Sequence, residues 1–194
     1  MISDKQISKG NDNQQISGDN NSQIKINKVL LINQKSEIFA KPNLIFKLLK
    51  VIYNSLNLLE GKWDLTVPAP IQKKLKFNKV DYYEKIFDEY AAGLETISKV
   101  MSRFPDSSRI VMVIYRFFIK FNSIENKKKN YSGDEVLEKV FDAVEQYLKK
   151  DPGFSVLNIT EEQMDDFTYA LMLYCVSECK LLKNPNEEEE ERWF

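Results

Sequence analysis

The 194-residue chain is 43% hydrophobic and 12% aromatic, which is enough apolar material for one buried core and a tail. Its 28 Lys and Arg residues against 29 Asp and Glu give a net charge of -1, so we expect contact with nucleic acid only indirectly. Histidine is absent, which excludes Ser/His/Asp and Cys/His triads, His-ligated zinc and His-ligated haem.

The sequence also indicates where the chain works. It has no run of about 18 consecutive apolar residues, the length that a membrane span needs. Its first residues lack the apolar run of a signal peptide, and two cysteines without such a signal indicate reduced thiols. We therefore expect a cytoplasmic protein that makes no membrane contact.

Residues 1–28 form a polar arm that repeats a unit close to Gln-Ile-Ser-Gly-Asp-Asn-Asn. One apolar side chain marks each repeat, namely Ile7, Ile16 and Ile24. A single copy buries too little to offset its chain entropy. The arm is thus either a disordered low-complexity tail or a β-like segment that stacks between several chains through Asn and Gln ladders. In the second case the three isoleucines bind other copies.

Apolar residues at helical spacing predict five helices between residues 29 and 185, so the predicted fold is all-α, a five-helix bundle-like domain behind the short β-like arm. The predicted helices cover 43–60, 81–102, 110–121, 132–150 and 160 to about 182, where Pro185 stops the last one. Residues 62–80, with Pro68 and Pro70, are predicted to be an extended connector. The stretch 110–121 is apolar on nearly all sides, which also fits a buried strand. Its length and the helices predicted before and after it favour a helix that is central to the core or to an interface.

Local signals fix some helix starts. Ser132 with Glu135, and Thr160 with Gln163, are predicted capping boxes. Residues 186–194 are an acidic tail that ends in Trp193 and Phe194, two aromatics of the type that anchors interfaces, and we expect them to bind a partner.

No residue is assigned a catalytic, cofactor-binding or metal-binding role. Cys175 and Cys179 lie at i and i+4 of the last predicted helix, a spacing that suits neither a disulfide nor a complete metal site, and we interpret them as buried small apolar residues. Glu178 and Lys180 match the Glu-x-Lys end of a metal-dependent nuclease motif. That motif needs a strand, whereas i and i+2 of a helix point to different faces.

Three stretches together resemble one known module, the C-terminal domain of bacterial ABC-three-component conflict systems. The stretch 68–78, Pro-Ala-Pro-Ile-Gln-Lys-Lys-Leu-Lys-Phe-Asn, resembles the opening Pro-x-Lys-Ile-x-Phe/Tyr-Asn of that domain. The stretch 179–185, Cys-Lys-Leu-Leu-Lys-Asn-Pro, resembles its closing Cys-Lys-Ile-Leu-Glu-Asn-Pro. Residues 15–24 resemble the linker often found before it, so the resemblance covers about residues 15–185.

The resemblance implies a non-enzymatic adaptor. In that family the domain couples an effector to a small middle component and to an ABC-type or SMC-like ATPase, and related anti-phage systems include Lamassu. The chain departs from the family in lacking an effector domain ahead of the linker and in carrying Lys183 where Glu is usual. It is therefore either a standalone subunit or part of a longer effector. The positions that match the family are expected to hold the connector against the last helix: Lys74, Phe77, Asn78, Cys179, Lys180, Asn184 and Pro185.

Two alternatives stay open at this stage. One is a small metal-dependent nuclease that uses Glu178 and Lys180 with other acids. The other is a helical protein that self-assembles through its N-terminal arm without an ATPase partner. A gene for a large ATPase next to the gene for this chain separates the adaptor from the second alternative.

Overall fold

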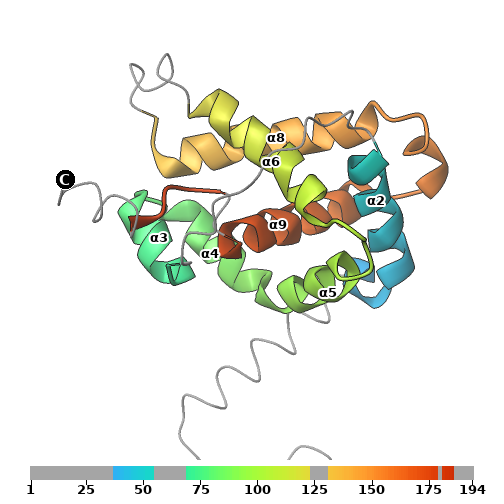
Figure 1. Cartoon of the computed structure of the whole chain (residues 1–194), viewed down its shortest axis with the longest axis horizontal. Helices are drawn as coiled ribbons and strands as arrows, with labels where there is room; N and C mark the ends of the chain where they lie inside the picture. The colour runs from blue at the N-terminus through green and yellow to red at the C-terminus, as the bar shows by residue number, and fades with distance from the viewer. Residues whose placement is uncertain (1–36, 55–68, 123–130, 179–180, 186–194) are drawn as a thin grey trace, which may run out of the picture.

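The computed structural model describes residues 37–54, 69–122, 131–178 and 181–185. Within these ranges the chain forms seven α-helices and two short 3-10 helices and contains no strand, which confirms the all-α class (Figure 1). The elements in chain order are η1 (Glu37–Ala40), α2 (Pro42–Asn54), α3 (Ile71–Phe77), α4 (Tyr82–Glu89), α5 (Ala91–Met101), α6 (Ser108–Phe121), α8 (Gly133–Lys149), η2 (Ser155–Leu157) and α9 (Glu161–Ser177).

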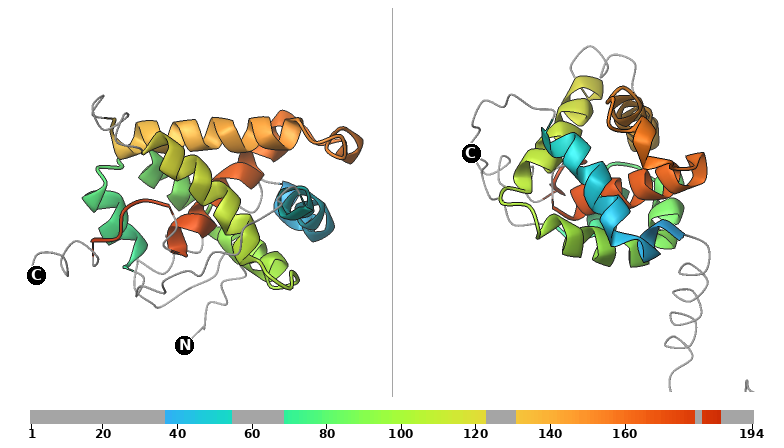
Figure 2. Two further views of the ribbon diagram at one scale, coloured as in Figure 1. Left: turned by 45° about the horizontal axis from the view of Figure 1, so that its top comes forward. Right: turned by 90° about the vertical axis from the view of Figure 1, so that its right-hand side faces the viewer.

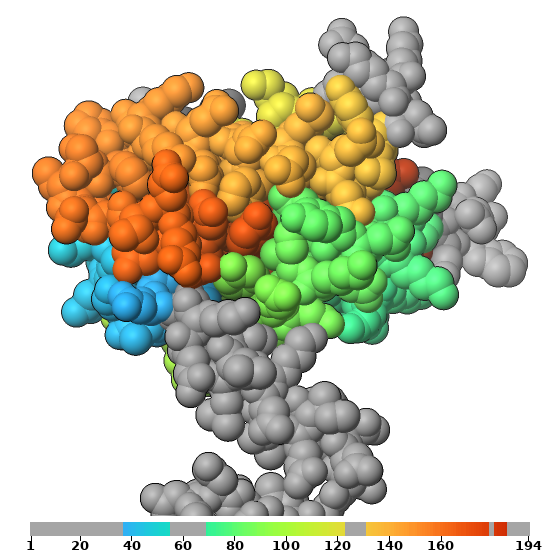
Figure 3. Space-filling model, turned by 180° about the vertical axis from the view of Figure 1, so that it is seen from behind, coloured from blue at the N-terminus to red at the C-terminus, as the bar shows by residue number. Residues whose placement is uncertain are grey.

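The centre of the bundle is α9. It packs against α5, α8, α4, α6 and η1, and it runs through the middle of the molecule in all views (Figure 2). Ten of its 17 residues are buried: Met164, Asp166, Phe167, Thr168, Ala170, Leu171, Met172, Leu173, Cys175 and Val176. On the face that Figure 3 shows, the first turns of α9 reach the surface between α8 and the segment that contains η1. A helix that is apolar on most sides is one that neighbours surround.

The stretch 110–121 is a helix, as predicted, and the alternative of a buried strand is wrong. It is not at the centre of the core, however, and its place at an interface stays a prediction. In α6, Arg116, Ile119 and Lys120 are exposed, while a second face buries Ile110, Val111, Val113, Ile114 and Phe118. The helix therefore covers one side of the core. Its many apolar residues predicted that it would be buried on more sides than it is.

The predicted five helices become seven in the described part for two reasons. Residues 71–77, which we expected to be extended, form α3, because the extended backbone imposed by the prolines ends at Pro70 with ψ of 140°. The predicted helix 81–102 breaks at Tyr90, where ψ is 10°. The break allows α4 and α5 both to pack along α9.

The last helix is shorter than predicted. It ends at Ser177. Residues 181–184 are not helical, and Leu182 among them adopts a positive φ of 70°. Leu181 and Leu182 are nevertheless buried. They are apolar because they pack in the core, and their positions in the sequence happened to continue the helical pattern. The predicted pairing of Cys175 with Cys179 on one helix face involves a residue outside the described ranges.

Both capping boxes are confirmed. In α8, Glu135 N–H donates to Ser132 Oγ over 3.2 Å and Ser132 N–H donates to Glu135 Oε2 over 2.8 Å. In α9, Gln163 N–H donates to Thr160 Oγ1 over 3.2 Å and Thr160 N–H donates to Gln163 Oε1 over 3.5 Å. These pairs satisfy amide groups that a helix start leaves without internal partners.

Several sequence predictions lie outside the described residues. These are the arm 1–28 with Ile7, Ile16 and Ile24, the tail 186–194 with Trp193 and Phe194, and the pair Cys179 and Lys180. Among the helices that are described, none has the length and apolar character needed to cross a bilayer.

Candidate partner-binding site at the α3 corner

The α3 corner consists of α3, the turn Asn78–Asp81, the first turn of α8 and residues 181–185. Lys74 fixes α3 in it. Its side chain is 0% exposed, and its Nζ donates a short hydrogen bond to the carbonyl oxygen of Val176 near the end of α9. The last carbonyls of a helix lack intrahelical donors and carry the negative end of the helix dipole, so a lysine ammonium satisfies both the hydrogen bond and the charge.

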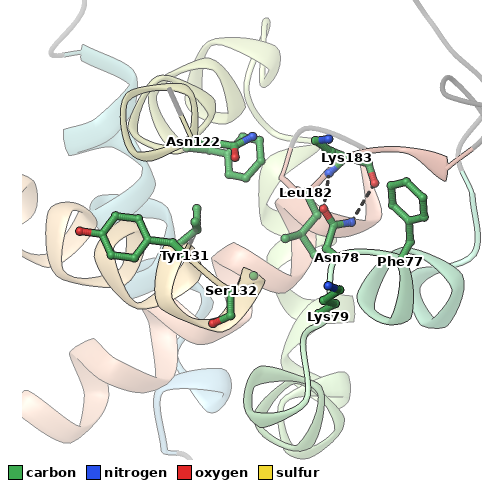
Figure 4. A pocket seen from close by; sticks show the side chains of 11 residues that line it. Phe77, Asn78, Lys79, Asn122, Tyr131, Ser132, Leu182 and Lys183 are labelled. Carbon is green, nitrogen blue, oxygen red and sulfur yellow. Dashed lines mark hydrogen bonds between the residues drawn. The ribbon is translucent and has the colours of Figure 1, made fainter. Parts of the chain in front are cut away.

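Asn78 joins the turn after α3 to the segment after α9. Its Nδ2 donates to the carbonyl oxygen of Lys183 over 2.9 Å, and its Oδ1 accepts from Lys183 N–H over 3.0 Å (Figure 4). The same Nδ2 donates to the carbonyl oxygen of Lys74 over 2.8 Å. One side-chain amide thus pairs with both backbone groups of a residue 105 positions away.

The end of α3 is a Schellman motif. Val80 N–H donates to the carbonyl oxygen of Leu75 over 3.0 Å, and Lys79 N–H donates to that of Lys76 over 3.2 Å. Lys79 adopts φ of 54°, a left-handed conformation that usually selects glycine. Leu75 and Val80 are both buried, which supplies the hydrophobic contact of this motif.

The first turn of α8 lies directly against this turn. A Cβ added to Gly133 would lie 2.4 Å from the carbonyl oxygen of Asn78 and 2.5 Å from Val80 Cγ2, so the close approach requires glycine. Asp134 Oδ2 accepts from the N–H groups of Asp81 and Tyr82, each over 3.0 Å, and its Oδ1 accepts from Tyr83 N–H over 2.9 Å. The carboxylate therefore caps α4 from a different helix.

A groove with a volume of about 220 Å³ opens at this corner. Tyr131 and Asn122 lie on the side opposite Phe77, with Asn78 and Lys183 between them (Figure 4). Lys79 and Lys183 are the charged residues of its lining, which contains no acid, and Phe77 is 38% exposed. The complete lining is Phe77, Asn78, Lys79, Phe118, Asn122, Tyr131, Ser132, Gly133, Val136, Leu182 and Lys183. Such a basic and aromatic surface is better suited to binding an acidic peptide segment than to catalysing a reaction.

The structure brings together two of the three stretches on which the resemblance depends. Lys74 and Asn78 contact α9 and the segment after it, Phe77 lines the groove, and Asn184 and Pro185 are buried in that segment. Cys179 and Lys180 are outside the described residues. Gly133 and Asp134 were not predicted to belong to a site, although both lie inside the Ser132 capping box that marks the start of a helix.

Of the two residues considered for nuclease chemistry, the structure describes Glu178 and not Lys180. Glu178 is exposed at the C-cap of α9, and no group of three or more His, Cys, Asp or Glu residues is placed to hold a metal ion in the described part of the chain. Cys175 is fully buried, and burial raises the pKa of its thiol, with a smaller contribution from the charge of Glu178. A thiol with a raised pKa is a poor nucleophile.

A second group of acids lies between α8 and α9. Burial, first, and then the neighbouring carboxylate of Glu145 together raise the pKa of Asp165 to about 6. Glu145 also pairs with Lys149 over 2.9 Å. Nearby, Tyr90 donates to Asp166 over 2.6 Å and Tyr83 donates to Glu138 over 2.9 Å. These contacts tie α4 and α8 to one another and α9 to Tyr90, and we assign them a structural role.

The fold and the α3 corner define a helical domain with a basic, aromatic groove. Comparisons with protein-family models, with curated proteins and with solved structures found no match.

Proposed function

We propose that the chain is a non-enzymatic adaptor of an ATPase-driven bacterial anti-phage defence complex, in which it links effector and ATPase components. The observation that carries the proposal is the contact between the stretches that resemble the two ends of the family domain. Lys74 bonds to Val176 and Asn78 bonds to Lys183, so the opening and closing stretches form one structural unit. This contact supports the interpretation that the chain resembles the whole family domain. Two short matches that arose by chance would not be expected to lie against each other in the structure.

In this proposal the helical domain binds the ATPase-containing partners in the cytoplasm, and the repeat of residues 1–28 associates with other copies of the chain. The domain supplies a surface, and the ATPase and the effector supply the chemistry. The net charge of -1 favours contact with DNA through those subunits.

The test is co-expression of the tagged chain with a large ATPase and a middle component of the kind that the resemblance implies, taken from genes next to the gene for this chain. We expect all three to purify together through an affinity step and a gel-filtration step in 300 mM salt. The result that overturns the proposal is separation of the chain from both proteins under conditions in which the other two remain associated. A chain without residues 1–28 should keep the ATPase and lose self-association.

The nuclease alternative has its own experiment. The purified chain is incubated with plasmid DNA and Mg²⁺ or Mn²⁺, alongside a Glu178→Gln variant. If the wild-type chain cleaves the DNA and the variant does not, the chain is a nuclease and the adaptor proposal is wrong. The adaptor proposal expects no cleavage by either.

A further inference from the structure

The groove at the α3 corner has a positive charge and an aromatic wall. Lys79 and Lys183, both exposed, supply its charge, while Phe77, Phe118 and Tyr131 supply aromatic rings. The start of α8 and the end of α6 both meet the groove, at Ser132 and Asn122, so their helix dipoles oppose each other. The two lysines therefore decide the sign of the local potential, and an acidic, aromatic peptide is the complementary ligand.

The chain carries a segment of that composition shortly after Lys183, a residue of the groove lining. The described part ends at Pro185, two residues after Lys183, which lines the groove. Residues 186–194 then contain five consecutive glutamates, Glu187–Glu191, followed by Arg192, Trp193 and Phe194. Nine residues span up to about 30 Å when extended, so the segment is long enough to reach a groove whose lining includes Lys183.

We propose that residues 186–194 bind in this groove of the same molecule. The glutamates face Lys79 and Lys183, and an aromatic side chain of the tail packs on Phe77. A short tether holds the segment at a local concentration in the millimolar range, so a weak contact is enough to occupy the groove. The lysines are exposed, which makes the contact sensitive to salt and allows a partner to displace the tail.

The inference stands apart from the proposed function, because it concerns the chain alone. Its test uses the fluorescence of Trp193 in the full chain. The chain has two tryptophans, Trp63 and Trp193, and the difference between wild type and Trp193→Phe isolates the signal of Trp193. We expect emission at short wavelength and protection from acrylamide in low salt, with a red shift and loss of protection in about 1 M salt, where the Debye length is about 3 Å.

Charge-reversal variants make the test specific. In the variant that combines Lys79→Glu with Lys183→Glu, the emission of Trp193 in low salt should be red-shifted and quenched by acrylamide. The wild type should show this behaviour only in high salt. Lys47→Glu combined with Lys76→Glu makes the same change of net charge at exposed positions outside the groove lining, and should leave Trp193 protected. Circular dichroism of each variant shows whether the helical domain is intact.

Two outcomes overturn the inference. The first is a Trp193 that is equally accessible to acrylamide in the wild type, the groove variant and the control. The second is protection that appears only as protein concentration rises, together with a doubled molar mass in light scattering, because that result places the tail in the groove of a second copy.

Discussion

The ammonium group of Lys74 is fully buried and donates to the carbonyl oxygen of Val176, 102 residues later in the chain. The bond ties the short helix α3 to the end of the central helix α9. Seven residues are too few for a helix that is stable alone, so α3 depends on this contact and on the burial of Leu75. The pair sets the position of the groove, whose wall begins at Phe77 on the same helix.

Replacing Lys74 by Met keeps most of the side-chain volume and removes the donor. The carbonyl of Val176 then stays buried without this partner, and we expect a loss of about 1–3 kcal/mol in the free energy of unfolding. The measurement is urea denaturation followed by circular dichroism. Lys76→Met is the matched control, because Lys76 is exposed on the same helix. Equal midpoints for the Lys74 variant and the control would show that the bond contributes nothing.

Asn78→Asp tests the connection between α3 and residues 181–185. The substitution keeps an acceptor for Lys183 N–H but places a carboxylate oxygen against the carbonyl oxygens of Lys74 and Lys183, where the amide donated. We expect faster hydrogen exchange in a peptide covering 181–185, with little change in α8. Unchanged exchange in 181–185 would contradict the assigned role of the side chain.

Asp134→Ala removes the cap of α4. Three backbone N–H groups, those of Asp81, Tyr82 and Tyr83, lose their carboxylate acceptor, and caps of this kind contribute about 0.5–2 kcal/mol. We expect a lower midpoint of unfolding and faster exchange at the start of α4. Gln146→Ala, at an exposed position of the same helix, is the control and should change neither. A midpoint equal to that of the control would show that Asp134 does not stabilise the start of α4.

Asp165 predicts how stability depends on pH. Its pKa in the folded chain is raised to about 6, above the usual value, so the folded state binds this proton more tightly than the unfolded state does. The protonated Asp165 therefore contributes its full stabilisation of the folded state at pH values below the pKa of Asp165 in the unfolded chain. This contribution is lost as the pH rises through the pKa of Asp165 in the folded chain. Asp165→Asn lacks this titration. We therefore expect the variant to be more stable than wild type at pH 7, and the advantage to shrink as pH falls to about 4.

Thermal unfolding of both proteins from pH 4 to pH 7.5 measures this effect. The wild type should lose melting temperature relative to Asp165→Asn mainly between pH 4 and pH 7. Parallel profiles would mean that folding does not raise the pKa of Asp165.

Local chemistry made part of the fold predictable. The capping boxes at Ser132 and Thr160 are short-range signals that involve residues three positions apart, and both formed as predicted. The helix over 110–121 followed from its length. By contrast, the break at Tyr90 and the end of α9 at Ser177 depend on packing between distant segments, which periodicity does not encode.

The α3 corner was only partly accessible from the sequence. The resemblance drew attention to Lys74 and Asn78, but their bonds go to backbone groups, whose positions no side-chain pattern reveals. Gly133 matters because a neighbouring turn approaches it, and Asp134 because it caps another helix. Such roles arise only when segments distant in sequence are brought together.

The most direct test of the adaptor proposal is the molar mass of a mixture of the purified chain with the purified ATPase and middle component, measured by light scattering after gel filtration. The adaptor proposal predicts one species whose mass equals a whole-number combination of the three subunits, with the chain present in it. A chain that elutes at its own mass at every mixing ratio, while the other two associate, would contradict the proposal.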